Sequence, residues 1–322
     1  MFLRRRVPET GPLKAAVIGA GAFGRHHAAK YNAMAGVELF AIADPSADVR
    51  VNAFAQYGVL AVADWRDLLG KVDLVSICSP AVTHAEIVRA FLNAGTHVLV
   101  EKPIATTSEE AADLVTLARR TGLVLTVGHQ ERFVFARTGL LNQPVMPREI
   151  QCWRRGPWTG RGDDVSAVLD LMIHDLDLVH RLVDSPVTDV KARGVVQYGP
   201  HADEISAAVT FANGTVARMD TSRIAETRKR GLRAVYDDGV VEIDFLTRDV
   251  KNTTPRPLAA LEMGDPLGES VGNFVAAVKG GSAPMVLAEQ AARALQTALA
   301  IDEAVEAAMP ARQPAALGRA VA

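Results

Sequence analysis

Three residues from two distant stretches of the chain could together oxidise an alcohol. Lys102 follows a short apolar run, while Asp170 and His174 stand four residues apart in a stretch that predicts a helix. An imidazole, whose pKa lies near neutrality, can take the proton of an alcohol as hydride leaves the carbon. A lysine ammonium can stabilise the oxygen anion that develops. The spacing puts Asp170 on the same helix face as His174, where it could orient the imidazole; an ordinary surface pair is the alternative.

A glycine-rich turn near the start of the chain could hold the hydride acceptor. Residues 19–24 have the pattern Gly-x-Gly-x-x-Gly, between an apolar strand and a helix. The first glycine permits a tight turn, the second lets the backbone approach a pyrophosphate, and the third allows close packing of helix and strand. Asp44 ends the next strand, where a carboxylate can bind both ribose hydroxyls. Because a carboxylate repels a 2′-phosphate and no Arg or Lys follows directly, we expect NAD rather than NADP.

The elements that must position these residues follow from hydrophobic periodicity. In the first part, strands are expected at 13–18, 37–43, 60–62, 74–78, 97–100 and 123–127, with helices at 47–57, 83–94 and 108–121. Continuous apolar strands that alternate with helices indicate a parallel, doubly wound sheet. Ser79 and Pro80 follow the fourth strand at the ligand-binding edge, and His84 begins the next helix. All three are expected to line the cofactor site, although a plain helix-end role is open for His84.

The second part has a different pattern. Strands are expected at 148–154, 187–198, 204–211, 215–223, 231–236 and 240–245, with helices at 168–182, 271–279 and 287–308. Asn213-Gly214 and Asp238-Gly239 are typical of two-residue type I′ hairpins. We therefore predict an α/β protein with a Rossmann domain at 13–128 and an α+β domain with a large, mainly antiparallel sheet at 129–309. A disordered N-terminus, 1–12, and a tail, 310–322, would flank them.

The sheet of the second part also bears on assembly. One of its faces would pack on helices. We expect the other face to be apolar and therefore costly to leave in water. On that ground we predict that this face forms the interface of a homodimer or homotetramer.

The composition excludes several classes of partner. Among 322 residues, 35 Lys+Arg against 37 Asp+Glu leave a formal charge of −2, so no basic field exists to hold nucleic acid or an anionic membrane. No apolar run reaches the roughly 18 residues of a membrane span. Basic residues 4–6 precede Val7-Pro8 rather than an apolar stretch, so we expect a cytoplasmic protein without a signal peptide. The histidines lack metal-ligand spacing, and no metal is expected.

Three stretches together resemble one enzyme family. The glycine turn, residues 94–103 (AGTHVLVEKP) and the Asp170-x-x-x-His174 pair look like the Gfo/Idh/MocA oxidoreductases, over about residues 14–308. The resemblance implies an NAD(P)-dependent dehydrogenase of a cyclic sugar, with Lys102, Asp170 and His174 as its catalytic residues. Non-catalytic nucleotide-sensing regulators of this family are the alternative, which these three residues together disfavour. The residues then expected to bind the cofactor are Gly19, Gly21, Ala22, Phe23, Gly24, Asp44, Ser79, Pro80, His84, Glu101 and Lys102.

Arginine and tryptophan residues in the second part suggest the kind of substrate. Guanidinium groups suit a diphosphate, and an indole can stack on a sugar or base; solvated surface charge is the alternative for each arginine. Residues 127–133 and 169–178 resemble the branch of the family that contains UDP-N-acetylglucosamine 3-dehydrogenases. A UDP-sugar is therefore favoured over inositol or a free sugar. The expected substrate contacts are Arg132, Arg154, Trp158 and Arg161.

Overall fold

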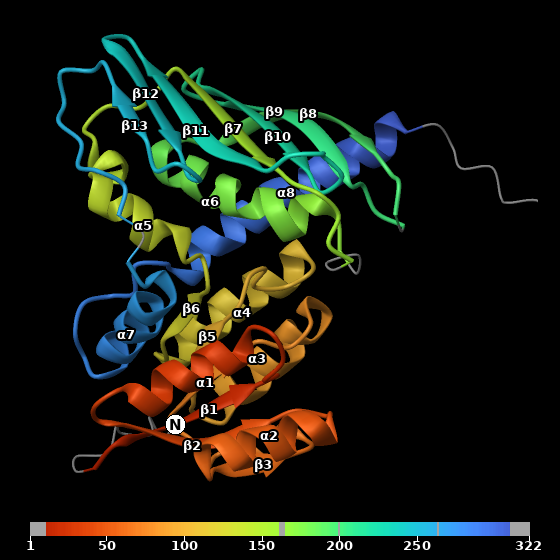
Figure 1. Ribbon diagram of the computed structural model, residues 1–322, viewed down its shortest axis with the longest axis vertical. Coiled ribbons are helices and arrows are strands. Elements are labelled where there is room, and N and C mark those ends of the chain that lie inside the picture. Colours follow the sequence, from red (N-terminus) through yellow and green to blue (C-terminus); the bar gives the residue numbers. More distant parts are fainter. Residues whose placement is uncertain (1–10, 161–164, 199, 263, 310–322) are drawn as a thin grey trace, which may run out of the picture.

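The structure is a computed structural model that describes residues 11–160, 165–198, 200–262 and 264–309. Two layered domains are stacked along the long axis, with a parallel sheet in one and a second sheet at the far end of the other (Figure 1). The expected tail, 310–322, and nearly all of the expected disordered N-terminus, 1–12, lie outside the described residues.

The first sheet is parallel and has six strands in the order β3-β2-β1-β4-β5-β6. Its strands are β1 (Leu13–Ile18), β2 (Val37–Ala43), β3 (Leu60–Val62), β4 (Leu74–Ile77), β5 (His97–Val100) and β6 (Leu125–Val127). The helices between them are α1 (Gly24–Ala33), α2 (Ala47–Tyr57), α3 (His84–Asn93) and α4 (Ser108–Thr121). This order confirms the doubly wound fold. Its switch point lies between β1 and β4, whose carboxyl ends frame a crevice for a ligand.

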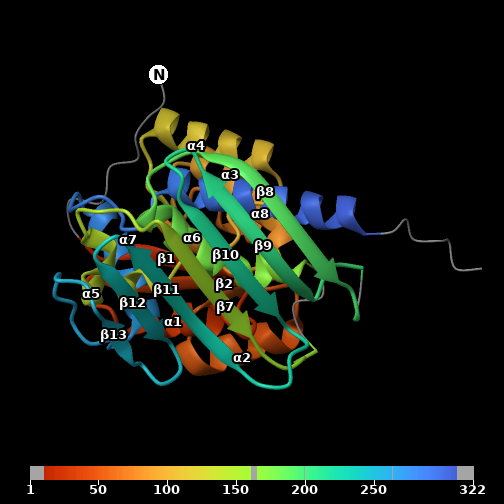
Figure 2. The same cartoon turned by 90° about the horizontal axis from the view of Figure 1, so that it is seen from above.

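The second sheet has seven strands in the order β13-β12-β11-β7-β10-β9-β8. They are β7 (Glu149–Arg155), β8 (Val187–Val195), β9 (Glu204–Phe211), β10 (Val216–Ser222), β11 (Lys229–Tyr236), β12 (Gly239–Asp244) and β13 (Val250–Asn252). All neighbours are antiparallel except β7 and β10, so the predicted mainly antiparallel sheet is confirmed. Seen from above, its strands cover the helices of this domain (Figure 2).

Helices fill the space between the two sheets. The later helices are α5 (Glu131–Thr138), α6 (Ile173–Leu182), α7 (Pro266–Val278) and α8 (Ala288–Ala308). Helix α8 contacts α4 and β6 of the first domain as well as α6 and β8 of the second, and so ties the domains together. The sequence pattern does not indicate α5 or the three-residue β13, because both are too short for a clear period.

Helix α7 belongs spatially to the first domain. It packs on α1 and β5, and its Val271 and Phe274 share a buried cluster with Leu13 and Tyr31. The range 129–309 that we expect for the second domain therefore contains a helix that covers the first sheet. An amphipathic pattern shows that a helix buries one face, but not which sheet that face will meet.

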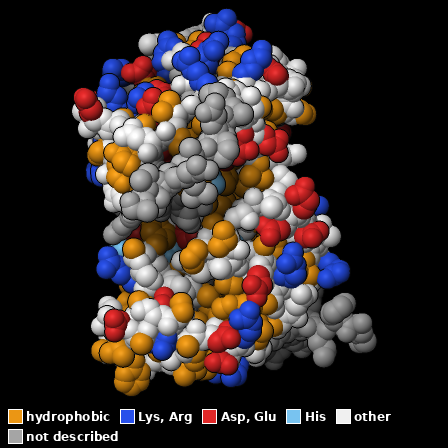
Figure 3. All heavy atoms as spheres, turned by 90° about the vertical axis from the view of Figure 1, so that its right-hand side faces the viewer, with side chains coloured by type: hydrophobic (Ala, Val, Ile, Leu, Met, Phe, Trp, Pro, Cys, Tyr) orange, Lys and Arg blue, Asp and Glu red, His pale blue; other side chains and the backbone are white. Residues whose placement is uncertain are grey.

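The outer face of the second sheet is charged, which is a correction to the apolar face expected from the sequence. Along β7 the side chains alternate, so that Ile150 and Cys152 are buried while Gln151 and Arg155 point outward. On this outer face Arg155 forms ion pairs with Glu204 and Asp220 of the neighbouring strands. Lys and Arg side chains gather over this sheet at the top of Figure 3. The homodimer or homotetramer stays a prediction, but the apolar face on which we based it is not present in the structure.

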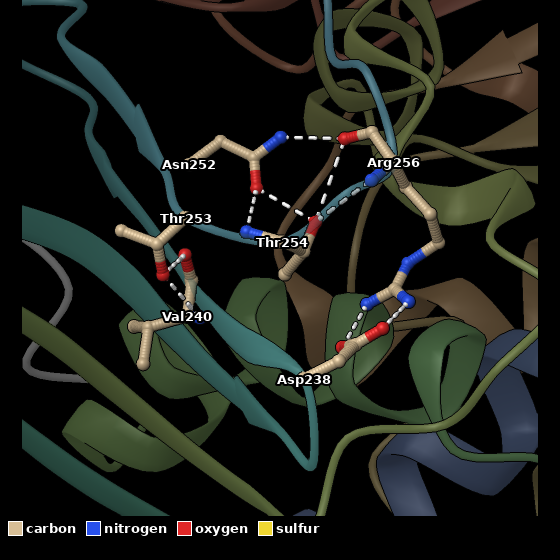
Figure 4. A network of polar contacts seen from close by, with 6 residues as sticks. All are labelled: Asp238, Val240, Asn252, Thr253, Thr254 and Arg256. Atoms are coloured by element: carbon tan, nitrogen blue, oxygen red, sulfur yellow. Dashed lines mark hydrogen bonds and ion pairs between the residues drawn. The ribbon is translucent and has the colours of Figure 1, made fainter.

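The two hairpins differ from the expected type I′ turns. Among the described residues only Arg248 has a positive φ without being glycine, so neither Asn213 nor Asp238 adopts the required conformation. Gly214 alone is left-handed at φ +88°, and its N–H donates to Phe211, as in a type I turn followed by a bulge. The other loop is Asp237-Asp238, and the guanidinium of Arg256 binds the Asp238 carboxylate across it (Figure 4).

Candidate active site

The glycine turn after β1 is shaped by close contacts at two of its three glycines. Gly19 has φ +81°, and a Cβ added to Gly24 would lie 1.9 Å from the Gly19 oxygen. An added Cβ at Gly21 would meet nothing within 4 Å. The first and third glycines are therefore needed by the fold, while the second faces open space where a pyrophosphate can approach. Ala22 and Phe23 complete the turn at the start of α1.

The carboxylate of Asp44 lies at the end of β2, beside this turn. One oxygen accepts the N–H of Ala20 at 2.8 Å and the other accepts the N–H of Ser46 at 2.9 Å. Each carboxylate oxygen keeps a second lone pair, which a ribose hydroxyl can use. A cavity of about 560 Å³ opens here, and Gly19, Gly21, Asp44, Ser79 and Pro80 are among its lining residues. These features fit the adenosine and pyrophosphate parts of a dinucleotide.

His84 lies beneath the cofactor crevice rather than in its lining. Its ring is buried, with Nδ1 2.7 Å from the Pro103 carbonyl and Nε2 2.9 Å from the Ser79 carbonyl. The ring therefore joins the loop after β4 to the loop after β5. Its position supports the two loops, and among the described residues it does not border the cavity beside Asp44.

Glu101 ends a chain of buried polar side chains that crosses the first domain. Its carboxylate accepts hydrogen bonds from Gln130, at 3.0 Å, and lies 2.9 Å from His27 Nε2. His27 Nδ1 is in turn 3.0 Å from the Ser76 hydroxyl, which also bonds Tyr31. The sequence offers no motif for this chain, because its members are far apart, with 74 positions between His27 and Glu101 alone. It holds Glu101 rigidly beside Lys102.

Lys102 and Asp170 meet across the domain interface. The Lys102 ammonium lies 2.9 Å from the Asp170 carboxylate and 2.7 Å from the Asp170 carbonyl oxygen. Asp170 stands in a five-residue π-helical turn, Val168–Met172, that precedes α6. The expected contact with His174 is absent among the described residues, because the carboxylate is taken by the nearby ammonium. Asp170 thus positions Lys102 directly, and His174 follows one turn later.

His174 has the surroundings of a neutral base. Its ring is half-buried, and Nδ1 is buried without a hydrogen-bond partner among the described residues. Burial lowers the pKa of His174 well below its usual range, and the positive charges of Lys102, Arg154 and Arg230 lower it further. The imidazole is therefore unprotonated at neutral pH, which is the state that can accept a proton.

A second imidazole, missed by the sequence analysis, stands against the first. His129 is 2 % exposed, and its ring meets the His174 ring edge-on at 6.3 Å between centroids. Neither of its nitrogens has a hydrogen-bond partner in the described part of the chain, and burial lowers its pKa. It therefore packs against the His174 ring as a second buried imidazole. It lies on the loop after β6, within the stretch 127–133 that resembles one branch of the family, but no motif spacing assigned it a role.

Two of the four expected substrate contacts lie in the protein interior, which corrects that expectation for Arg132 and Arg154. Arg132 is 1 % exposed and binds Asp177 through two of its nitrogens. Arg154 is 2 % exposed and binds both Asp175 and Glu131. Both guanidiniums form ion pairs with carboxylates inside the protein, because an unpaired buried charge is costly.

The other two expected contacts have different outcomes. Trp158 stacks on Tyr198, with ring centroids 4.8 Å apart, and Arg223 lies over its ring at 5.2 Å. Arg161 lies outside the described residues. The acids Asp175 and Asp177 both pair with arginines, and the described residues hold no cluster of His, Cys, Asp and Glu suited to a metal ion.

Comparison with protein families covers most of the chain. Residues 13–129 match the oxidoreductase family with an NAD-binding Rossmann fold, and residues 140–242 match the GFO/IDH/MocA C-terminal domain. The chain belongs to the Gfo/Idh/MocA oxidoreductase family. The glycine turn and Lys102 lie within the first matched range, and Asp170 and His174 lie within the second.

Relatives within the Gfo/Idh/MocA family act on sugars and inositols. UDP-N-acetylglucosamine 3-dehydrogenase of Acidithiobacillus ferrooxidans is 36% identical over 73% of this chain and 74% of its own length. A solved structure of that enzyme has a TM-score of 0.86 and covers 92% of this chain and 99% of its own. Inositol 2-dehydrogenase/D-chiro-inositol 3-dehydrogenase of Halalkalibacterium halodurans is 30% identical over 55% of each chain.

Membership of this family determines the class of activity. The chain is an NAD-binding dehydrogenase that acts on CH–OH groups. The residues around the glycine turn fit that cofactor, since Gly21 leaves room for a pyrophosphate and Asp44 can bind the ribose. Among the described residues, no helix has both the length and the apolar character needed to span a membrane.

Proposed function

We propose that the protein oxidises a secondary hydroxyl of a cyclic sugar, and that its substrate is a sugar nucleotide, as in a UDP-N-acetylglucosamine 3-dehydrogenase. The observation that carries this proposal is the ion pair of Lys102 with Asp170 at 2.9 Å, one helical turn from His174. It brings an ammonium of the first domain to a residue of the second domain that stands one helical turn before the His174 imidazole. A hydroxyl placed between the ammonium and the imidazole would meet both a proton acceptor and a positive charge.

The chemistry follows from the protonation states of these two groups. A sugar hydroxyl is too weak an acid to ionise at neutral pH, so His174 takes its proton while the carbon loses hydride. Lys102 donates a hydrogen bond to the same oxygen and stabilises the negative charge that builds on it. Asp170 keeps the Lys102 ammonium in place through its carboxylate and carbonyl. NAD, when bound, supplies the hydride acceptor.

The choice of a UDP-sugar is supported by the relative that is 36% identical over nearly three quarters of this chain. Oxidation of an inositol is the alternative, because a relative of that specificity is 30% identical over about half of the chain. A purely regulatory role is disfavoured by the Lys102–Asp170–His174 arrangement, since sensing a nucleotide needs no proton acceptor.

A substrate panel tests the proposal. The purified protein is incubated with NAD and with UDP-sugars, inositols or free hexoses, and NADH absorbance is followed. We expect turnover of a UDP-sugar, and we expect the His174→Ala variant to lose it while still binding NAD in a titration. Turnover of an inositol with none of any UDP-sugar would replace the favoured substrate. If no sugar is oxidised, and the His174→Ala variant responds to its binding partner as the wild type does, the protein would be a nucleotide-sensing regulator and not an enzyme.

A further inference from the structure

An arginine that the reaction does not use faces the active-site helix from the second sheet. Arg230 lies on β11 directly opposite Arg154 of β7. Side chains alternate along a strand, and Leu232 and Ala234 of the same strand are buried. Arg230 therefore belongs to the inner face, which packs over α6, and two guanidiniums stand side by side there.

These two neighbouring cations differ in their ion pairs. Arg154 is held by the carboxylates of Asp175 and Glu131. Arg230 is half-buried, and no described residue forms a hydrogen bond or ion pair with its guanidinium. Burial is the main cause that lowers the pKa of Arg230, and the charge of Arg154 lowers it further, while the nearby carboxylates of Glu131 and Asp175 oppose this shift. The Arg230 guanidinium is therefore near the two carboxylates, but in the described residues both of them form ion pairs with Arg154 and not with Arg230.

Arg230 also lies near His174, because its cross-strand neighbour Arg154 binds Asp175, the residue that follows His174. Its charge is among those that depress the pKa of His174, together with Lys102 and Arg154. The cations facing His174 thus come from the β5 loop, β7 and β11. Only Arg154 and Lys102 of these have a carboxylate partner among the described residues. Of these three cations, Arg230 is the one whose guanidinium has no hydrogen bond or ion pair with a described residue.

We propose that Arg230 binds an oxyanion carried on the sugar ring of the substrate, foremost the phosphate of a sugar nucleotide. The planar guanidinium can donate two parallel hydrogen bonds to such a group. A phosphate on one carbon of a six-membered ring is held at a fixed distance from each ring hydroxyl, so a guanidinium that binds the phosphate also fixes which hydroxyl reaches His174. The carboxylate of a uronic acid offers the same chemistry. This inference rests on the proposed function and names the group that recognises its substrate.

Substitution of Arg230 tests the proposal against a matched control. Arg233 lies on the same strand but on the outer face, 3.9 Å from Glu242. In Arg230→Gln we expect KM for a UDP-sugar to rise about 10- to 100-fold, the size of a lost charged hydrogen bond. KM for the unphosphorylated sugar should not change. Arg233→Gln should match the wild type with both substrates, and Arg230→Lys should restore part of the affinity.

Measuring KM for a sugar 1-phosphate and for a uronic acid separates the two sources of the oxyanion. A KM effect confined to the phosphates identifies a phosphate site, and one confined to the uronate identifies a carboxylate site. An equal rise for the unphosphorylated sugar, or no rise for any anionic sugar, would overturn the inference. Calorimetric binding of UDP and sugar 1-phosphate provides a readout without turnover. If no sugar is oxidised but Arg230→Gln abolishes binding of these ligands, the proposed function fails while the anion site stands.

Discussion

The ammonium of Lys102 and the carboxylate of Asp170 lie 2.9 Å apart, although 68 positions separate them in the chain and each belongs to a different domain. The ammonium also donates to the Asp170 carbonyl at 2.7 Å, so both groups of one residue hold it. Lys102 is 20% exposed and Asp170 30% exposed, which leaves both within reach of a substrate. The position of Lys102 therefore depends on the closed arrangement of the two domains.

The first prediction concerns this pair. Lys102→Met should lower kcat by roughly 100- to 1000-fold, because the charge that stabilises the developing oxyanion is lost. Asp170→Asn should lower kcat by about 10- to 100-fold, because the ammonium loses its carboxylate. Combined, the two substitutions should cost little more than Lys102→Met alone. Steady-state kinetics of the four proteins give the answer, and strictly additive effects would show that the two residues act separately.

The second prediction concerns the pH dependence of His174. A pKa held below the usual value of about 6.5 means that the base stays neutral, and kcat/KM stays flat, as pH falls from about 8 to 6.5. Activity is lost only when pH falls through the depressed pKa. His174→Ala should reduce kcat by roughly 100- to 10,000-fold, with partial rescue by added imidazole. A limb of the wild-type profile at or above pH 6.5 that vanishes in this variant would contradict the assignment.

The third prediction separates cofactor binding from folding in the glycine turn. Gly21→Ala meets no atom within 4 Å, so its melting temperature should equal that of the wild type. NAD affinity should fall at least about tenfold, because the methyl group occupies the approach of the pyrophosphate. Gly24→Ala places its Cβ 1.9 Å from the Gly19 oxygen and should lower both stability and NAD affinity. Thermal melting and NAD titration measure the two effects; equal losses of stability in both variants would refute this division.

The fourth prediction concerns stability in acid. His97 Nδ1 accepts the N–H of Val124 at 3.0 Å, which requires an unprotonated nitrogen, and burial lowers the pKa of His97 to about 4. The unfolded chain binds this proton near pH 6.5, so stability is full above that pH and falls as pH drops toward 4. His97→Asn keeps an acceptor without the titration. Urea unfolding should show the wild type losing about 1–2 kcal/mol more than the variant between pH 7 and 5.

A surface histidine serves as the control for this prediction. His26 is exposed on α1, and His26→Asn should retain the full acid sensitivity of the wild type. An identical loss of stability in wild type, His97→Asn and His26→Asn would show that other groups dominate the acid response.

The local pattern of the chain was enough to predict most elements of the fold and to propose candidate residues for the site. Apolar strands that alternate with helices set the order of the first domain, and the boundaries of α2, α4 and β9 match the expected ranges. Gly19, Gly24 and Asp44 could be proposed for the cofactor site because their spacing is local. Lys102 and His174 could be proposed as catalytic residues because each stands in a recognisable stretch, and these roles stay predictions.

What only the tertiary structure decided is which charged group meets which. A four-residue spacing predicts a shared helix face, but it says nothing of a lysine from another domain that takes the Asp170 carboxylate first. In the same way Arg132 and Arg154 form ion pairs with buried acids, while Arg230 forms none with the part of the chain that the structure describes. Periodicity encodes burial of one face, whereas the choice of a counterion depends on distances between segments that the folded core brings together.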